Sequence, residues 1–495
     1  MRGLTFFSNC VIWYGIHSFK RHPSTPQRSL RSPKVWAHDV FGLADLGDAR
    51  RTKRLLKVAT TLAAKPLDSL CQACDTLSEI KGAYRLIANK KITSEMLITP
   101  STEHAVKACQ NQPVILAISD TTSLNFTNHR ATSGLGPIGK IQYQGLHFHS
   151  TLALRPDGLP VGLLRQKVWV RDELEYGKRR QRKQKPIQDK ESYLWVENIT
   201  HIDRALDNLK EEDRPYVIHI FDREGDIHEV FQAVHEAGAG CVIRSAWNRR
   251  IEEEQKYLHD QVLNAPVIHR GFQEVKRREG RPKRQALLEY RAVAVTLEPS
   301  QRKFRPREPL PIHIVSACEI NPPQNVEPIQ WFLNTTEPID SVQDVLEIVR
   351  LYTMRWRIEE YHLVLKSGCR IEKVQFESAD NIKKVLSLMA AAALRLLQIT
   401  YQARLDPDLA CTVVLGDSEW RALQARIQHK RVPKKARPPT LKQAILWIGR
   451  LGGHMGRKSD GMPGVRTLWR GWRDLQILVV MFEIYQETPQ NSVHA

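Results

Sequence analysis

The stretch Tyr352-Thr-Met-Arg-Trp-Arg-Ile-Glu-Glu-Tyr-His-Leu-Val-Leu-Lys366 contains neither glycine nor proline and has the residue preferences of a helix. At a helical period of about 3.6 residues, Tyr352, Arg355, Glu359 and Lys366 fall on one stripe of that helix. Two cations, an acid and a phenol are unsuited to a core. They suit a phosphate group, with the acid holding a metal ion and the cations holding the phosphate. The alternative is a solvated face with ion pairs one turn apart.

The composition favours a polyanionic partner. The chain has 495 residues, enough for about two to four domains. Its formal net charge is +20 and its pI about 9.6, which indicates nucleic acid or an anionic membrane. The most apolar run, from Val385 to Ile399, is interrupted by polar residues and is predicted to be a buried helix. Nucleic acid is therefore the favoured partner, and no membrane is expected.

The cysteines indicate a reducing compartment. There are 8 of them, scattered along the chain, which is not the pattern of a disulfide framework. Cys71 and Cys74 form one CxxC pair, but no second pair lies at the spacing of zinc ligands. We therefore expect a cytoplasmic protein without zinc.

The N-terminal part divides into two segments. Residues 1–34 are predicted to be a disordered extension, and residues 35–110 a helical domain. Asp48 can cap a helix that begins at Ala49. The first turns of this helix carry Arg50, Arg51 and Arg54. Basic helix starts suit DNA phosphates, although a solvated surface helix has the same appearance.

Strand patterns begin after residue 110. Val114–Ile118, Tyr216–Phe221 and Gly240–Arg244 are short apolar runs of the kind found in buried strands, and helical patterns lie between the last two. This alternation predicts an α/β fold. We assign residues 111–375 to the core, with a β-rich insertion at about 245–330, and residues 376–495 to a helical domain.

Two aspartates directly follow buried strands. Asp120 comes after the first apolar run and Asp222 after the second. Strand ends are where α/β sheets place their sites, although an aspartate there is often only a turn or cap residue. If both converge with Glu359, three carboxylates can hold two divalent cations for phosphodiester cleavage. Oxygen ligands favour Mg²⁺, for which Mn²⁺ can substitute.

A glycine-rich stretch is a false lead. Gly134-Leu-Gly-Pro-Ile-Gly139-Lys140 fits the spacing of a phosphate-binding loop, but Lys140 is followed by a strand pattern and not by a helix. Without a helix N-terminus the loop lacks the dipole that receives a phosphate. Nucleotide binding is therefore not expected.

Four dispersed blocks resemble one protein family. Tyr352, Arg355, Glu359 and Lys366 match a Y-(2)-R-(3)-E-(6)-K signature at every spacing. The blocks around Asp120 and Asp222 and the stretch from Leu46 to Leu55 also match. In these blocks the chain resembles bacterial cut-and-paste DNA transposases of the DDE class that carry this signature. The resemblance covers roughly residues 36–475.

The resemblance implies a ribonuclease-H-like catalytic core in which Asp120, Asp222 and Glu359 are the catalytic metal ligands. It also implies binding to inverted terminal repeats, a homodimer in the synaptic complex, a hairpin intermediate and strand transfer into target DNA. The 376–495 segment would mediate dimerisation. A bacterial protein of this kind would be associated with the nucleoid.

The same resemblance implies further DNA contacts. Tyr352, Arg355 and Lys366 would hold phosphates near the transposon end, Trp331 would stack on a flipped base, and Arg244 would lie close by. For Trp331 a place in the core is an equal alternative. The alternatives for the whole chain are a stand-alone metal-dependent nuclease and a non-catalytic, domesticated DNA-binding protein.

Overall fold

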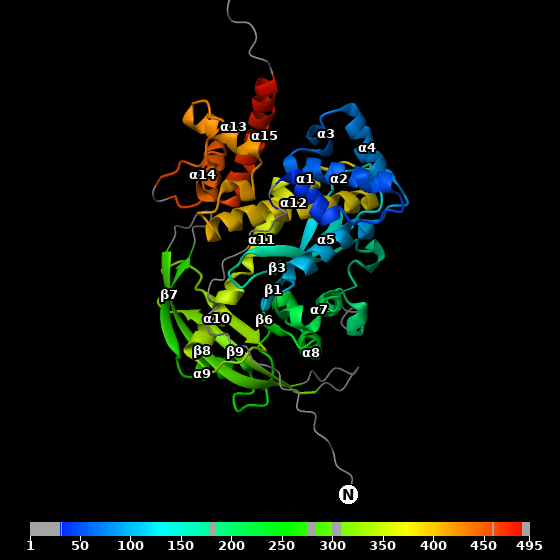
Figure 1. The fold of residues 1–495 in the computed structure, drawn as a ribbon. Coiled ribbons are helices and arrows are strands. Elements are labelled where there is room, and N and C mark those ends of the chain that lie inside the picture. Colours follow the sequence, from blue (N-terminus) through cyan, green and yellow to red (C-terminus); the bar gives the residue numbers. More distant parts are fainter. Residues whose placement is uncertain are drawn as a thin grey trace, which may run out of the picture.

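One mixed sheet runs through the molecule (Figure 1). The computed structural model describes residue 30 and residues 32–178, 185–275, 284–298, 308–457 and 460–487. The ten strands follow the order β2-β3-β1-β5-β6-β10-β9-β8-β7, with β4 paired to β3. β1 is parallel to β5 and β5 to β6, whereas the remaining pairs are antiparallel. The predicted α/β class is confirmed.

The first strand of the sheet is longer than the sequence pattern predicts. β1 spans Val114–Asn125, β2 Gly136–Ile138, β3 Lys140–Leu154 and β4 Pro160–Trp169. β1 was expected to end before Asp120, but antiparallel pairing with β3 continues to Asn125 opposite Gly145. Asp120 therefore lies inside the strand, and that expectation was wrong. The strand after Lys140 confirms that the glycine-rich stretch does not begin a helix.

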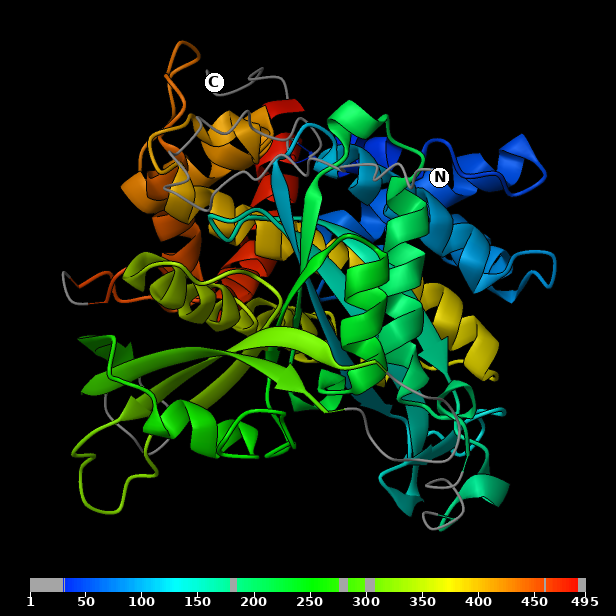
Figure 2. The same ribbon diagram turned by 90° about the horizontal axis from the view of Figure 1, so that it is seen from below.

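The middle of the sheet agrees with the prediction. β5 spans Tyr216–Phe221 and β6 Gly240–Arg244, and helices α7 (Tyr193–Leu206) and α8 (His228–Glu236) precede and separate them. Seen from below, α7 and α8 lie side by side over one face of the sheet (Figure 2). Asp222 directly follows β5, as expected.

The β-rich stretch extends the same sheet. Its elements are α9 (Leu258–Asn264), β7 (His269–Val275), β8 (Arg284–Leu297), β9 (Leu310–Glu319) and β10 (Gln330–Thr335). β10 pairs with β6 on one side and with β9 on the other. Three basic stretches of the sequence, at 179–184, 276–283 and 299–307, lie outside the described residues.

Helices lie at both ends of the described part of the chain. The N-terminal ones are α1 (Pro33–Phe41), α2 (Ala49–Ala64), α3 (Leu70–Ala73), α4 (Leu77–Ala88) and α5 (Ser94–Cys109). The C-terminal ones are α12 (Ala379–Leu405), α13 (Asp417–Gln428), α14 (Leu441–Leu451) and α15 (Val465–Glu487). None of the helices in the described ranges is both long and apolar enough to cross a lipid bilayer.

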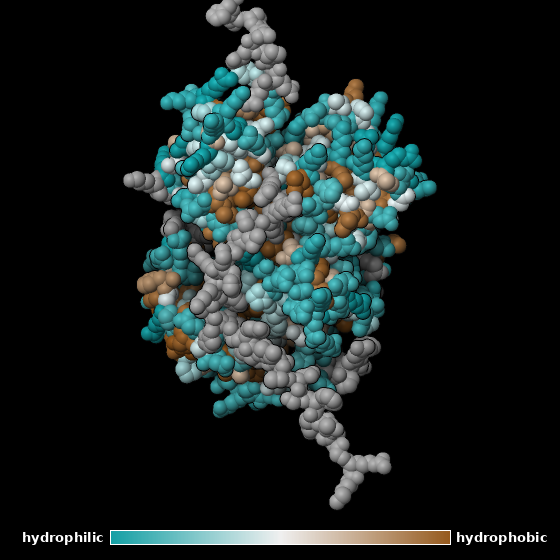
Figure 3. Space-filling view, viewed as in Figure 1, coloured by the Kyte–Doolittle hydropathy of each residue, from teal (hydrophilic) through white to brown (hydrophobic). Residues whose placement is uncertain are grey.

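The long helix α12 joins the two ends. It packs against α2, α4 and α5 on one side and against α14 and α15 on the other (Figure 1). Arg395, buried on α12, donates to the carbonyls of Ala63 (3.4 Å) and Leu30 (3.3 Å), and its guanidinium lies 5.6 Å from the Trp472 ring. Apolar residues at both chain ends thus share one core, while the face in Figure 3 is largely hydrophilic.

The predicted N-terminal extension ends earlier than expected. Leu30 is only 2% exposed, and Ser32 caps α1, which already begins at Pro33. Residues 30 and 32–34 therefore belong to the fold, because Leu30 is packed into the core and bonded to Arg395. The prediction for residues 1–29 and 31 lies outside the described part of the chain.

One buried acid leads to a pH-dependent prediction. Glu337 follows β10, is 3% exposed and accepts a hydrogen bond from the Tyr216 hydroxyl at 2.9 Å. Burial raises its pKa from 4.5 to about 7. Because the folded-state pKa is the higher one, the protonated carboxyl stabilises the fold at low pH, and this stability is lost as the pH rises through 7.

Glu337→Gln stays neutral, so its stability relative to the wild type should grow by about 2–3 kcal/mol between pH 5 and pH 8. Urea unfolding of both proteins at the two pH values measures this difference. A difference that does not change with pH would contradict the assigned shift.

Candidate functional site

The signature stretch is broken and does not form one helix. α10 spans Val342–Thr353, α11 spans Trp356–Leu363, and a π-helical turn, Val364–Gly368, follows. At the break, the Arg355 amide donates to the Tyr352 carbonyl three residues earlier at 3.0 Å. The prediction of a single helix, with all four signature residues on one stripe, was therefore wrong.

The break places Arg355 between two of the predicted acids. Its guanidinium donates to the Glu359 carboxylate and lies 3.9 Å from Asp120 Oδ2. Lys366 points elsewhere, because its ammonium group donates to the Ser123 carbonyl at 2.9 Å and lies 3.6 Å from Glu372 Oε1. The structure brings Arg355, Glu359 and Asp120 together and places Lys366 beside the far end of β1.

Asp120 projects toward α11. It has the same parity on β1 as Leu116 and Leu124, which belong to the core on that side of the sheet. The parallel register of β1 with β5 runs only as far as Ile118 opposite Ile220. Burial raises the pKa of Asp120 to about 7, the charges of Asp222 and Glu359 add to the rise, and Arg355 opposes it.

Asp222 stands at the end of β5, and its negative charge contributes to the raised pKa of Asp120. Its Oδ1 accepts the Glu224 amide at 2.8 Å and so caps the short 3₁₀ turn Arg223–Gly225. Burial, together with the charge of Asp222, also raises the pKa of Glu224. Acidic charge is thus concentrated at this edge of the sheet.

The acidic residues fit a divalent cation by their chemistry. Over the described parts of the chain, no three His, Cys, Asp or Glu side chains are grouped closely enough, as they stand, to hold a metal ion. Arg355 occupies the position between Asp120 and Glu359. Burial and the negative charges of Asp222 and Glu359 raise the Asp120 pKa, and a divalent cation would relieve this repulsion. The donors are the carboxylate oxygens that Mg²⁺ and Mn²⁺ prefer.

The other predicted contacts lie around Tyr352. Tyr352 is buried, and burial raises its pKa. The half-buried Trp331 on β10 meets its ring edge to face, with centroids 5.8 Å apart. Arg244 ends β6 opposite Leu333 and donates to the Gln330 carbonyl at 3.4 Å. Trp331 is therefore neither fully in the core nor fully exposed.

Sequence reasoning missed His362. Its Nδ1 lies 3.9 Å from Asp120 Oδ2, and its Nε2 shares a 2.8 Å hydrogen bond with the Ser150 hydroxyl on β3. Burial, together with the charges of Lys366 and Arg355, lowers the pKa of His362 to about 3. The ring is therefore neutral at ordinary pH. The available signal was its position three residues after Glu359, one helical turn along.

A second candidate site is a basic groove between α2 and α4. It has a volume of about 500 Å³ and is lined by Arg50, Arg51, Arg54, Ser78, Lys81, Gly82, Arg85, Leu86 and Asn89. Asp48 caps α2 as predicted, accepting the Arg50 amide at 2.8 Å. Arg51 also donates to the Leu46 carbonyl at 2.9 Å, so it holds the helix start as well as lining the groove.

Gly82 leaves room for the Arg54 guanidinium in this groove. The three atoms nearest to a Cβ added at Gly82 all belong to that guanidinium, which ends a flexible side chain, so Gly82→Ala should move the cation and keep α4 folded. If Arg54 contacts a phosphate, the slope of log affinity for DNA against log salt should fall by about 1. Fluorescence anisotropy with a labelled duplex measures the slope.

Gly464→Ala is the matched control, since a Cβ there meets open space. An unchanged slope in Gly82→Ala would argue against a phosphate contact by Arg54.

Three successive parts of the chain match protein-family models. Residues 33–92 match the model described as transposase DNA-binding, residues 197–395 the transposase DDE domain, and residues 391–488 the transposase Tn5 dimerisation domain. Together they support a DDE transposase with its domains in the order DNA-binding, DDE and dimerisation. More particularly, the C-terminal match is to a domain of the Tn5 type.

These matches bear on the two candidate sites. The DNA-binding match includes the basic groove, and the DNA-binding and dimerisation matches support DNA binding and homodimer formation. The DDE match includes Asp222 and Glu359 but begins after Asp120. Domains of this kind generally use divalent metal ions.

Proposed function

We propose that this protein is a DNA transposase that binds inverted repeats at transposon ends, cuts them through a hairpin intermediate and joins the released ends to target DNA. The observation that carries the proposal is that Arg355 contacts both Asp120 and Glu359, while the negative charge of Asp222 acts on Asp120. Acidic side chains around a cation at this edge of the sheet suit the metal-dependent cleavage of a phosphodiester. The net charge of +20 suits a polyanionic substrate such as DNA.

Asp120, Asp222 and Glu359 are the proposed ligands of Mg²⁺, or of Mn²⁺ in its place. Bound there, the ions would activate water or a 3′-hydroxyl and stabilise the charge on the leaving oxygen. Arg355 would exchange its contact with Glu359 for one with a DNA phosphate. Lys366 would neutralise a neighbouring phosphate, and neutral His362 would hold the Asp120 side of the site through Ser150.

The remaining contacts follow from position. Trp331, supported by Tyr352 at its ring edge, would receive a flipped base, with Arg244 beside them. Arg50, Arg51 and Arg54 would bind the terminal repeat in their groove. The proposed division is a helical end-recognition domain that begins with α1 at Pro33 and ends at residue 110, a ribonuclease-H-like core at 111–375 and a dimerisation domain at 376–495. The proposal also places the protein at the nucleoid of a bacterial cytoplasm.

A plasmid carrying the DNA that flanks the gene on both sides tests this function. In Mg²⁺ the protein should release the intervening segment, and EDTA should prevent the release. A stand-alone nuclease would cut this plasmid and one without the flanking DNA alike. A non-catalytic DNA-binding protein would bind both ends without cutting either. Either result would contradict the proposal.

A further inference from the structure

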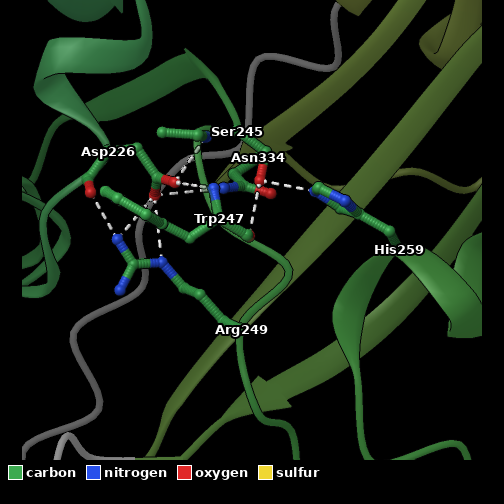
Figure 4. Close-up of polar contacts among 7 residues, drawn as sticks. Asp226, Ser245, Trp247, Arg249, His259 and Asn334 are labelled. Carbon is green, nitrogen blue, oxygen red and sulfur yellow. Dashed lines mark hydrogen bonds and ion pairs between the residues drawn. The ribbon is translucent and has the colours of Figure 1, made fainter.

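The loop after β6 is fixed in place by the buried carboxylate of Asp226, which is 3% exposed (Figure 4). Its Oδ2 accepts the amides of Ala246 (2.7 Å) and Trp247 (3.3 Å), and its Oδ1 accepts Arg249 Nε (3.1 Å) and Nη2 (2.9 Å). Asn334 on β10 adds a longer contact at 3.4 Å. One carboxylate therefore holds the backbone amides of Ala246 and Trp247 and the side chain of Arg249.

Ser245, the first residue after β6, also fixes this loop. Its hydroxyl donates to the Trp247 carbonyl at 3.1 Å and shares a 2.9 Å hydrogen bond with His259 Nε2 on α9. The His259 ring in turn stacks on Phe332 of β10, with centroids 4.2 Å apart and planes 10° from parallel. Both the amide and the carbonyl of Trp247 are thus bonded to buried or packed groups.

Trp247 as a whole residue is nevertheless 66% exposed. The bonds that Trp247 makes to Asp226 and Ser245 use its backbone amide and carbonyl, so they do not require a tryptophan there. A large planar ring on a loop that is already ordered loses little conformational entropy when it binds a partner. These properties suit a contact residue better than a packing residue.

The position of Trp247 identifies the partner. β5 and β6 are parallel, with Phe221 opposite Ile243, so the loop leaves the same edge of the sheet as Asp222. Arg223, which follows Asp222, is exposed and Arg244, which ends β6, is half-buried at this edge, and the charge of Arg244 reaches Tyr352. A strand of DNA bound at the acids would therefore lie near arginines that can bind its phosphates and near the Trp247 indole, which can stack on a base.

We infer that Trp247 is a second stacking residue, which engages an unpaired base of DNA beside the catalytic acids. The inference rests on the proposed function and adds to it a contact distinct from Trp331. Trp331 lies within β10, whereas Trp247 stands on the loop beyond β6. The ligand is DNA with a locally opened helix, because a paired base keeps both of its faces stacked on its neighbours.

Two labelled duplexes of one sequence, taken from the DNA flanking the gene, test this contact with the full-length protein. One duplex is fully paired and the other carries one extra, unpaired thymine near its end. Trp247→Ala should weaken binding of the second duplex roughly tenfold and of the first much less. Trp247→Phe, which keeps an aromatic face, should recover most of the loss.

Phe272→Ala is the matched control. Phe272 is 74% exposed on β7, the last strand in the sheet order, and three other strands separate β7 from β6. It should leave both affinities unchanged. If Trp247→Ala binds the unpaired duplex as the wild type does, the inference is wrong and the proposed function stands. If the wild type binds neither duplex, both are wrong.

Discussion

Asp120→Asn and Asp222→Asn should each reduce metal-dependent DNA cleavage by about a thousandfold or more and leave end binding nearly unchanged. Each substitution keeps the side-chain shape and removes one negative charge from the proposed cation ligands. Loss of a metal ion removes several kcal/mol of transition-state stabilisation, and each 1.4 kcal/mol is about a factor of ten in rate. In the proposed function the basic groove carries end binding, and neither substitution lies in that groove.

Cleavage of a labelled duplex under single-turnover conditions measures this effect, with a mobility shift of the same duplex as the binding assay. Glu224→Gln is the matched control, since Glu224 is an acid next to Asp222 that the proposal leaves out of the ligand set. It should cleave at close to the wild-type rate. Normal cleavage by either aspartate variant would exclude that residue as a ligand.

Asp226→Ala should lower the free energy of unfolding by about 3 kcal/mol or more. The substitution leaves Arg249 without its buried carboxylate and deprives the amides of Ala246 and Trp247 of their acceptor. Breaking one side of a buried pair costs more than an exposed pair contributes, because the other charge stays desolvated. The whole loop beyond β6 would lose its support.

Urea unfolding followed by circular dichroism measures the loss. Asp260→Ala is the control, because Asp260 makes one exposed hydrogen bond to Asn248 of the same loop, at 3.3 Å. Its effect should stay within about 0.5 kcal/mol. Equal stability of Asp226→Ala and Asp260→Ala would show that the buried pair does not stabilise the loop.

Local patterns predicted the parts of the fold that depend on local interactions. β5 and β6 have the predicted bounds, because each is a short buried strand with polar turns at its ends. Asp48 caps α2 as predicted, because capping involves only neighbouring residues. Asp222 follows from the same reasoning, since the end of a buried strand is visible in the sequence.

The errors arose where distant segments decide the structure. β1 continues through the polar residues after Ile118 because β3 pairs with them, from Ser119 opposite Thr151 to Asn125 opposite Gly145. The helix breaks at Met354 and Arg355, where the sequence has no glycine or proline that would predict a break. Leu30 belongs to the core because Arg395 and α12 reach it from the other end of the chain.

The candidate site was predicted in part. Asp120, Glu359 and Arg355 do meet, but through the break and not along one helical stripe. Lys366 pairs with Glu372, which no helical period indicates. His362 and the Asp226 cluster were missed, because their partners, Ser150 and Arg249, become neighbours only through the sheet.

The central claim is that Asp120, Asp222 and Glu359 jointly hold the catalytic divalent cations. The most direct measurement replaces Mg²⁺ with Fe²⁺ in the DNA-bound protein, adds ascorbate and peroxide, and maps where locally formed hydroxyl radicals cut the polypeptide. Cuts close to residues 120, 222 and 359, suppressed by excess Mg²⁺ and absent from Asp222→Asn, are the predicted result. Cuts confined to other parts of the chain, or cuts that Mg²⁺ does not suppress, would contradict the claim.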